Sequence, residues 1–365
     1  MIGLALSGGG SRAKAFHLGC FRALEDLGLL EKVAVLSTIS GGSVFGAYYA
    51  YSPDIRFDEF DRQMQTLLLE GLQGQLVGSA LMPQNLARGG FGVIRRGLHR
   101  LARWGRGQEE LPVRSFSRTE LFAQLLRRRL FGNLALDAPT KSKLEVIIGA
   151  CDLRTGTAFR FSAKAVGSWR LGRTVDVSHP VAFAVAASAA YPIFLPALDR
   201  VWEFDKDGVR RKRRVLLSDG GVYDNLGTAV LEPGRSAEFS LHTYQCKYLI
   251  ACSAGQGQEA GNDLPDSFLP RVEKSFNIVH RRVQDAAMSR LHALKESGQL
   301  AGFAMPYLGQ QDSRLPVPLA GLIPRSEVMN YPTDFAAMPR SWLDKIALRG
   351  EQLTRSLVMH YLSEL

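Results

Sequence analysis

Short apolar runs followed by glycines recur along the chain. Residues 33–39 form a β-branched apolar run that predicts a buried parallel strand, and the apolar segment from Val44 fits a buried helix. Residues 1–6 predict a second short strand, followed by three glycines and a helix that runs to about Gly28. Strand, helix and strand make a βαβ unit, whose right-handed crossover brings both strand ends to one edge of the sheet.

Similar patterns along the rest of the chain extend this unit to an α/β fold. The capping box formed by Ser117 and Glu120 predicts a helix over residues 121–131, and small residues at 181–190 predict a buried helix. Strands are predicted at residues 144–150, 159–162, 201–204, 214–217, 247–252 and 302–305, with 201–204 and 214–217 forming a hairpin. The last two predicted helices cover residues 267–296 and 342–362.

Residues 55–140 differ from the segments around them, because glycine, glutamine and arginine become frequent and the periodicity is patchy. As a helix, residues 94–106 place most arginines away from a face that carries Ile94, Leu98, Leu101 and Trp104. This basic amphipathic pattern suits an anionic membrane surface, and an ordinary surface helix is the alternative. We therefore expect a single domain over residues 1–365 with a helical, basic insertion or lid at about 55–140.

Composition and charge limit the kinds of partner and the cellular compartment that we expect for the protein. The chain has 365 residues and 46% hydrophobic content, enough for a large core, and its net charge of +10 favours an anionic partner. No signal-peptide pattern follows Met1, and the longest uncharged run, 181–198, contains two prolines. We expect a cytoplasmic protein in peripheral contact with an anionic membrane surface and no nucleic-acid partner; export without a signal peptide stays open, and the oligomeric state is not predicted.

Cysteine and histidine positions give no metal-binding pattern. The four cysteines stand singly in apolar contexts, which suits reduced core thiols, and the seven histidines are scattered. Neither Cys-x-x-Cys nor His-Glu-x-x-His occurs in the chain. We therefore expect neither a metal nor a cofactor.

The glycine loop after the first strand fits two kinds of site. The run from Gly8 to Ala13 satisfies the dinucleotide fingerprint G-x-G-x-x-A in its strand-turn-helix context. That fingerprint requires an acidic residue near the end of the second strand, where this chain has Thr38, Ile39 and Ser40. Amides of a glycine loop at a helix N-terminus form an anion site, and beside a serine they fit an oxyanion hole better. A Walker-A loop is excluded, because no Gly-Lys-Ser/Thr follows.

Ser40 stands on the bend between the strand predicted at 33–39 and the helix after it. A serine on such a turn projects its hydroxyl above the sheet edge, and neighbouring glycines let backbone and substrate approach closely. The nucleophile-elbow pattern is Gly-x-Ser-x-Gly; here Thr38 replaces the first glycine and Gly42 keeps the second. Ser40 is therefore a candidate nucleophile, and a serine that only caps the helix is the alternative.

Asp219 ends the run Val215-Leu-Leu-Ser-Asp219, which continues the strand predicted at 214–217, and Gly220 and Gly221 follow it. The two glycines release the backbone, so that the carboxylate projects from the strand end with little steric cover. An ordinary turn aspartate is the alternative. If Asp219 lies near Ser40, it can take the hydroxyl proton as a general base, and no histidine is needed.

Taken together, these motifs resemble the patatin-like phospholipase family, which is related to the cytosolic phospholipases. They are Gly8-Gly-Gly-Ser-Arg12, Ser40-Gly-Gly-Ser, the small-residue helix ending in Ser188-Ala-Ala-Tyr-Pro192, and Asp219-Gly-Gly, in the order of that family and over roughly residues 1–50 and 140–230. The resemblance implies a three-layer α/β/α sandwich with a mainly parallel central sheet. It also implies a Ser-Asp dyad, Ser40 and Asp219, with an oxyanion hole from Gly8, Gly9 and Gly10 supported by Arg12. Thr38 and Ala13 depart from the family's glycines.

The expected function is a lipid acyl hydrolase of the phospholipase A or lysophospholipase type, acting on a phospholipid or lysophospholipid. Two alternatives come from other classes. A Ser-His-Asp carboxylesterase requires a histidine late in the chain, such as His292 or His360, and both stand in core-like helical patterns. A non-catalytic protein that binds anionic membranes keeps the charge but does not need the dyad.

Overall fold

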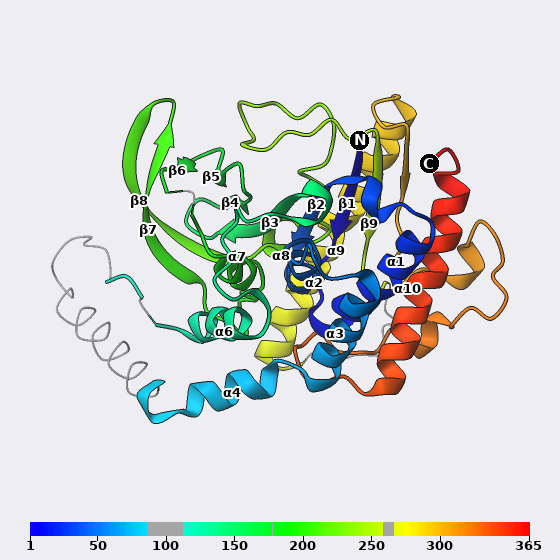
Figure 1. The fold of residues 1–365 in the computed structure, drawn as a ribbon, viewed down its shortest axis with the longest axis horizontal. Helices are drawn as coiled ribbons and strands as arrows, with labels where there is room; N and C mark the ends of the chain where they lie inside the picture. The colour runs from blue at the N-terminus through cyan, green and yellow to red at the C-terminus, as the bar shows by residue number, and fades with distance from the viewer. Residues whose placement is uncertain (86–111, 115, 177, 258–265) are drawn as a thin grey trace.

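A mixed sheet of ten strands forms the centre of the computed structural model, which describes residues 1–85, 112–114, 116–176, 178–257 and 266–365 (Figure 1). The strand order is β10-β9-β1-β2-β3-β4-β5-β6-β7-β8, and β3 also pairs with β8. The strands are β1 (Ile2–Leu6), β2 (Val33–Ile39), β3 (Glu145–Asp152), β4 (Thr157–Phe161), β5 (Val166–Ser168), β6 (Gly172–Thr174), β7 (Leu198–Lys206), β8 (Val209–Asp219), β9 (Tyr248–Cys252) and β10 (Gly302–Ala304).

The half of the sheet from β10 to β3 is parallel and contains the predicted βαβ unit. Leu6 of β1 lies opposite Thr38 of β2 and Cys252 of β9, so these three strands end together. Their residues are buried almost throughout, as parallel strands covered on both faces require. Strands β4 to β8 continue as an antiparallel meander. The predicted mainly parallel sheet thus describes the half that carries Ser40.

Helices cover both faces of the sheet, because successive strand residues point to opposite sides. Leu4 and Leu36 belong to a core shared with α1, α2 and α10, whereas Ala5 and Val35 belong to a second core with Leu291 of α9. The predicted three-layer α/β/α sandwich is therefore confirmed. The helices are α1 (Gly10–Asp26), α2 (Gly41–Ala50), α3 (Phe57–Glu70), α4 (Gln73–Leu81), α6 (Arg118–Leu126), α7 (Val181–Ser188), α8 (Gly221–Asp224), α9 (Phe268–Glu296) and α10 (Arg340–Tyr361), with short 3-10 turns at Leu30–Lys32, Lys141–Lys143, Asp312–Arg314 and Arg325–Glu327.

Helix α1 crosses α10 at two glycines that leave no space for side chains. A Cβ on Gly19 would lie 1.7 Å from the carbonyl oxygen of Ala347, and a Cβ on Gly350 would lie 2.4 Å from that of Phe16. Such a close approach of two backbones needs glycine on the facing side. Because α1 begins at the glycine loop, this contact fixes the direction in which the loop leaves the sheet.

The predicted insertion at residues 55–140 contains α3, α4, α6 and a π-helical turn at Arg127–Phe131. The capping box is confirmed, because the Ser117 hydroxyl accepts a hydrogen bond from the Glu120 amide. Helix α4 has no buried residue and lies at the lower left of Figure 1. The basic segment predicted at 94–106 lies outside the described residues. The lid role and the single-domain organisation stay predictions.

The other predicted elements are present with small shifts at their ends. Strands β7 and β8 run longer than predicted, so the basic run from Arg210 to Arg214 lies within β8 and Asp207 and Gly208 form the turn. Helix α7 ends at Ser188, two residues earlier than predicted. No helix of the described residues has the length and apolar character to cross a membrane.

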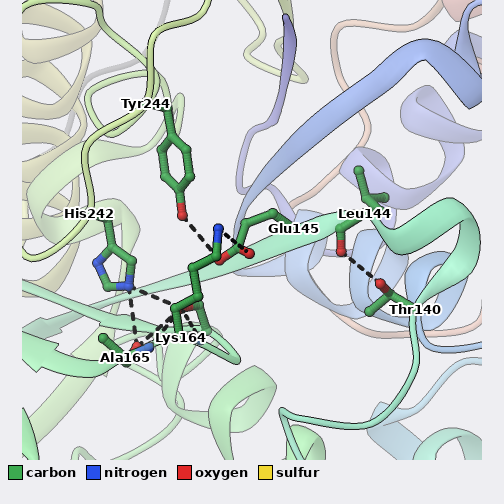
Figure 2. Close-up of polar contacts among 8 residues, drawn as sticks. Thr140, Leu144, Glu145, Lys164, Ala165, His242 and Tyr244 are labelled. Carbon is green, nitrogen blue, oxygen red and sulfur yellow. Dashed lines mark hydrogen bonds and ion pairs between the residues drawn. The ribbon is translucent and has the colours of Figure 1, made fainter.

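A polar cluster joins the start of β3 to the segment before β9 (Figure 2). Glu145, the first residue of β3, accepts a hydrogen bond from the Tyr244 hydroxyl at 3.1 Å and pairs with Lys164 at 2.9 Å. His242 Nε2 lies 3.2 Å from the carbonyl oxygen of Ala165, and burial lowers the pKa of His242 to about 3. The cluster therefore keeps a neutral histidine at the end of β3 away from Ser40.

Candidate active site

Ser40 occupies the turn between β2, which ends at Ile39, and α2, which begins at Gly41. Its φ of +52° is a left-handed conformation that non-glycine residues rarely adopt. Two glycines make the turn sterically feasible. A Cβ on Gly41 would lie 2.5 Å from the carbonyl oxygen of Gly10, and a Cβ on Gly42 would lie 2.6 Å from that of Leu6. The predicted strand-turn-helix geometry around Ser40 is therefore present.

Ser40 and Asp219 are brought into direct contact. The Ser40 hydroxyl donates a hydrogen bond to Oδ2 of Asp219 at 2.7 Å, and both side chains are buried. The Gly221 amide donates to Oδ1 of the same carboxylate at 2.7 Å. Burial raises the pKa of Asp219 to about 6, and the hydrogen bonds from Ser40 and Gly221 limit the rise. At neutral pH the carboxylate is therefore largely ionised and able to accept a proton.

The two glycines after Asp219 leave little space for side chains. A Cβ on Gly220 would lie 2.3 Å from the carbonyl oxygen of Gly149 in β3, and a Cβ on Gly221 would lie 2.8 Å from Oδ1 of Asn225. The amide of Asp219 donates to the carbonyl oxygen of Ala190 at 3.0 Å. The Asp-Gly-Gly turn is thus held from both sides, and larger residues at either glycine would displace the carboxylate.

The three predicted oxyanion-loop glycines do not have equivalent amides. The Gly8 amide donates to the carbonyl oxygen of Asn225 at 3.1 Å, so it is already engaged. Among the described residues, no hydrogen-bond acceptor is found for the amides of Gly9 and Gly10. Gly10 borders the elbow, since its nitrogen lies 2.7 Å from the position of a Cβ on Gly41. Gly9 and Gly10, with φ of +138° and +59°, are therefore the amides available to bind an anion.

Arg12 connects this glycine loop to two other segments of the chain. Its Nε donates to the carbonyl oxygen of Ala254 at 3.0 Å, and Nη1 donates to that of Tyr331 at 2.7 Å. The side chain is buried, and this burial lowers the pKa of Arg12 to about 10. Arg12 thus joins the start of α1 to the end of β9 and to the 331–336 segment. It provides no described hydrogen bond to Ser40 or Asp219.

The two departures from the family pattern fit into the core. Ala13 is fully buried, with its Cβ 3.3 Å from the position of a Cβ on Gly9. Thr38 is also fully buried, and its hydroxyl donates to the carbonyl oxygen of Ile147 at 3.3 Å. Neither side chain obstructs the contact between Ser40 and Asp219.

The described histidines make their hydrogen bonds away from the Ser40 hydroxyl. Nε2 of His17 lies 3.0 Å from the carbonyl oxygen of Ser7, and Nε2 of His280 lies 2.8 Å from that of Gly221. The ring of His292 packs on Phe303. His280 was not predicted as a site neighbour, because its place on α9 depends on a contact that is remote in sequence. Within the described chain no group of three metal-ligating side chains is found.

These features define an α/β protein with a serine and a buried aspartate in contact at the edge of its sheet. A family model for patatin-like phospholipase matches residues 4–231, and the chain belongs to this family. No protein with a curated description matches the sequence.

Two solved structures show the same fold. Human GIVD cytosolic phospholipase A2 is 15% identical with a TM-score of 0.55, and the match covers 98% of this chain and 58% of that one. The same human protein in complex with methyl gamma-linolenyl fluorophosphonate is 13% identical with a TM-score of 0.51, over 98% and 57% of the two chains. This chain therefore spans less than two thirds of the length of these relatives.

Proposed function

We propose that the protein is a lipid acyl hydrolase of the phospholipase A or lysophospholipase type, with Ser40 as nucleophile and Asp219 as general base. The observation that carries the proposal is the hydrogen bond of 2.7 Å from the Ser40 hydroxyl to Asp219 in a member of the patatin-like phospholipase family. Asp219 supports it further, because its pKa of about 6 lies close to the pH at which a general base must work.

The proposed reaction has two steps. Asp219 takes the proton of Ser40 as the hydroxyl oxygen attacks the acyl carbonyl, and the amides of Gly9 and Gly10 bind the oxyanion. The carbon–oxygen bond to the alcohol then breaks, and Asp219 returns the proton to that alcohol. In the second step Asp219 takes a proton from water, the hydroxide attacks the acyl-serine, and the fatty acid leaves as Ser40 regains its proton.

The proposed substrate is a phospholipid or lysophospholipid at a membrane surface. The human relative binds an alkenyl fluorophosphonate, a reagent that combines a lipid chain with a phosphorus electrophile. The net charge of +10 favours peripheral contact with anionic lipid on the cytoplasmic side. We propose the whole chain as one catalytic domain with the 55–140 segment as its insertion or lid.

The test is labelling by an alkyl fluorophosphonate together with hydrolysis of a fluorogenic acyl ester. The wild type is expected to carry the label on Ser40, and Ser40→Ala is expected to lose several orders of magnitude in hydrolysis while remaining folded by circular dichroism. Ser37→Ala is the matched control, because Ser37 is a buried serine of β2. Label on Ser37 or Ser43, or full activity of Ser40→Ala, would refute the assignment.

A further inference from the structure

Ser188 contacts both halves of the Ser40–Asp219 pair. Its hydroxyl oxygen accepts a hydrogen bond from the Ser40 amide at 2.9 Å, and its carbonyl oxygen accepts one from the Gly220 amide at 3.1 Å. Ser188 is the last residue of α7 and is fully buried. One residue therefore fixes the backbone at the serine and the backbone next to the aspartate.

The Ser188 hydroxyl is also the first member of a chain of three buried hydroxyls. Its oxygen lies 2.8 Å from Oγ of Ser43, Ser43 donates to Oγ1 of Thr38 at 3.0 Å, and Thr38 donates to the carbonyl oxygen of Ile147 at 3.3 Å. All three hydroxyl residues are fully buried. A hydroxyl has one proton, and Thr38 and Ser43 have already donated theirs. The proton between Ser188 and Ser43 therefore comes from Ser188.

The direction of this chain leaves the Ser188 oxygen as an acceptor for the Ser40 amide. Hydrogen bonds that point one way polarise and strengthen each other in a buried environment. Ser40 needs such support because its φ of +52° is strained for a residue with a side chain, and strain persists only where neighbours hold it. Its carbonyl oxygen is held separately, by the amides of Ser43 and Val44 at 2.9 and 3.2 Å.

We propose that Ser188, together with Ser43 and Thr38, is a positioning residue that holds Ser40 in line with Asp219. The inference rests on the proposed function, in which Ser40 is the nucleophile. It also explains Thr38, since threonine in place of the elbow's first glycine supplies the hydroxyl that ends the chain. The three hydroxyls take no proton from Ser40 and so act only by holding its backbone. Loss of one of these hydroxyls is therefore expected to lower the rate of acylation and to leave substrate affinity unchanged.

The kinetic test compares Ser188→Ala with a buried serine outside the chain. Ser218→Ala is the matched control, because Ser218 precedes Asp219, is buried, and donates its hydroxyl proton to the Ala190 carbonyl oxygen at 3.0 Å. Loss of the acceptor leaves the Ser40 amide unsatisfied, so we expect Ser188→Ala to slow fluorophosphonate labelling and kcat by about 10- to 100-fold with KM within about twofold. Ser218→Ala is expected to stay within about twofold in both.

The far end of the chain gives an independent pair of variants. Thr38→Val has almost the same shape but removes the acceptor for Ser43, so it is expected to lower kcat by about tenfold. Thr38→Ser keeps the hydroxyl and is expected to restore most of the rate. Equal losses for Ser188→Ala and Ser218→Ala, or equal rates for Thr38→Val and Thr38→Ser, would overturn the inference.

Hydrogen exchange of the Ser40 amide tests the same contact without any catalysis. In a Ser40→Ala background, adding Ser188→Ala is expected to speed exchange at residue 40 by at least about tenfold, whereas adding Ser218→Ala is not. Unchanged exchange would refute the positioning role. If Ser188→Ala does not fold, Ser43→Ala provides the same comparison. A wild type that takes no label on Ser40 would refute the proposed function, and the exchange result would still decide the role of Ser188.

Discussion

Acidification is expected to switch off the reaction through Asp219 while the protein stays folded. Burial raises the pKa of this carboxyl to about 6, against 3.8 in an exposed peptide, and only the ionised form can take the proton of Ser40. A carboxyl with a pKa of 6 is about 90% ionised at pH 7 and about 10% at pH 5. We therefore expect kcat/KM at pH 5 to be about one tenth of its plateau, with a further tenfold fall by pH 4.

The assay is kcat/KM for a fluorogenic acyl ester between pH 4 and pH 8, since this quantity reports the pKa of the free enzyme. Circular dichroism at each pH separates titration from unfolding. Asp224→Asn is a suitable control, because Asp224 accepts hydrogen bonds from the amides of Gly227 and Ala229 in the segment after Asp219. Its profile is expected to keep the inflection near pH 6. A rate that stays flat from pH 7 to pH 5 in folded protein would refute the reasoning.

The raised pKa of Asp219 also affects stability: as pH rises, activity is expected to increase while the free energy of unfolding decreases. The folded state binds the proton of Asp219 more tightly than the unfolded chain, so the free energy of unfolding falls as pH rises from about 4 to about 6. At neutral pH the ionised carboxylate costs about 3 kcal/mol, from a difference of about two pKa units at about 1.4 kcal/mol each. Asp219→Asn is therefore expected to abolish hydrolysis and to raise the melting temperature; a lowered melting temperature would contradict this sign.

Three further outcomes are expected. Gly9→Pro removes the amide proton and also forces φ from +138° to about −65°, whereas Gly9→Ala keeps the amide, so kcat of the proline variant is expected to be about 10²- to 10³-fold below that of the alanine variant; equal rates would argue against this amide as an oxyanion donor. Each single His→Ala variant is expected to keep most activity, with packing loss only at His17, and a folded but inactive variant would indicate a Ser-His-Asp triad. Binding to anionic vesicles is expected to weaken with salt and after replacing four arginines of residues 94–106 by glutamine, namely Arg95, Arg96, Arg100 and Arg103, whereas equal binding to neutral vesicles would contradict it.

The position of the glycine loop beside Ser40 can be predicted from the sequence, because it follows from the handedness of the crossover and from strand direction. Parallel strands joined by a right-handed crossover end at the same sheet edge, and this rule alone places the glycine loop beside Ser40. It does not place Asp219, because β8 is antiparallel to β3 and pairs Asp219 with Ala150. That position was predicted only through the resemblance to the family.

The supporting contacts were beyond sequence reasoning for a different physical reason. The Gly8 amide is engaged by Asn225, and the Ser40 amide by Ser188, which is 148 residues away in the chain. Such contacts have no local periodicity, since a buried amide is satisfied by any acceptor that the tertiary fold brings to it. The motif that contains Ser188 is recognisable in the sequence, but nothing in the sequence indicates that the Ser188 hydroxyl contacts the Ser40 amide.

The contact geometry itself argues for direct proton transfer between Ser40 and Asp219. In a Ser-His-Asp triad an imidazole stands between the two groups and makes a hydrogen bond of about 2.8 Å on each side. Here the serine and carboxylate oxygens are 2.7 Å apart, which leaves no room for a ring. Separating them would move either the elbow or the Asp-Gly-Gly turn. A Cβ on Gly41, Gly42 or Gly220 would lie only 2.3–2.6 Å from a neighbouring carbonyl oxygen, so both backbones are packed against neighbouring backbone. Distance and packing therefore both support the proposed direct transfer, and the burial of the pair also raises the Asp219 pKa into the working range of a general base.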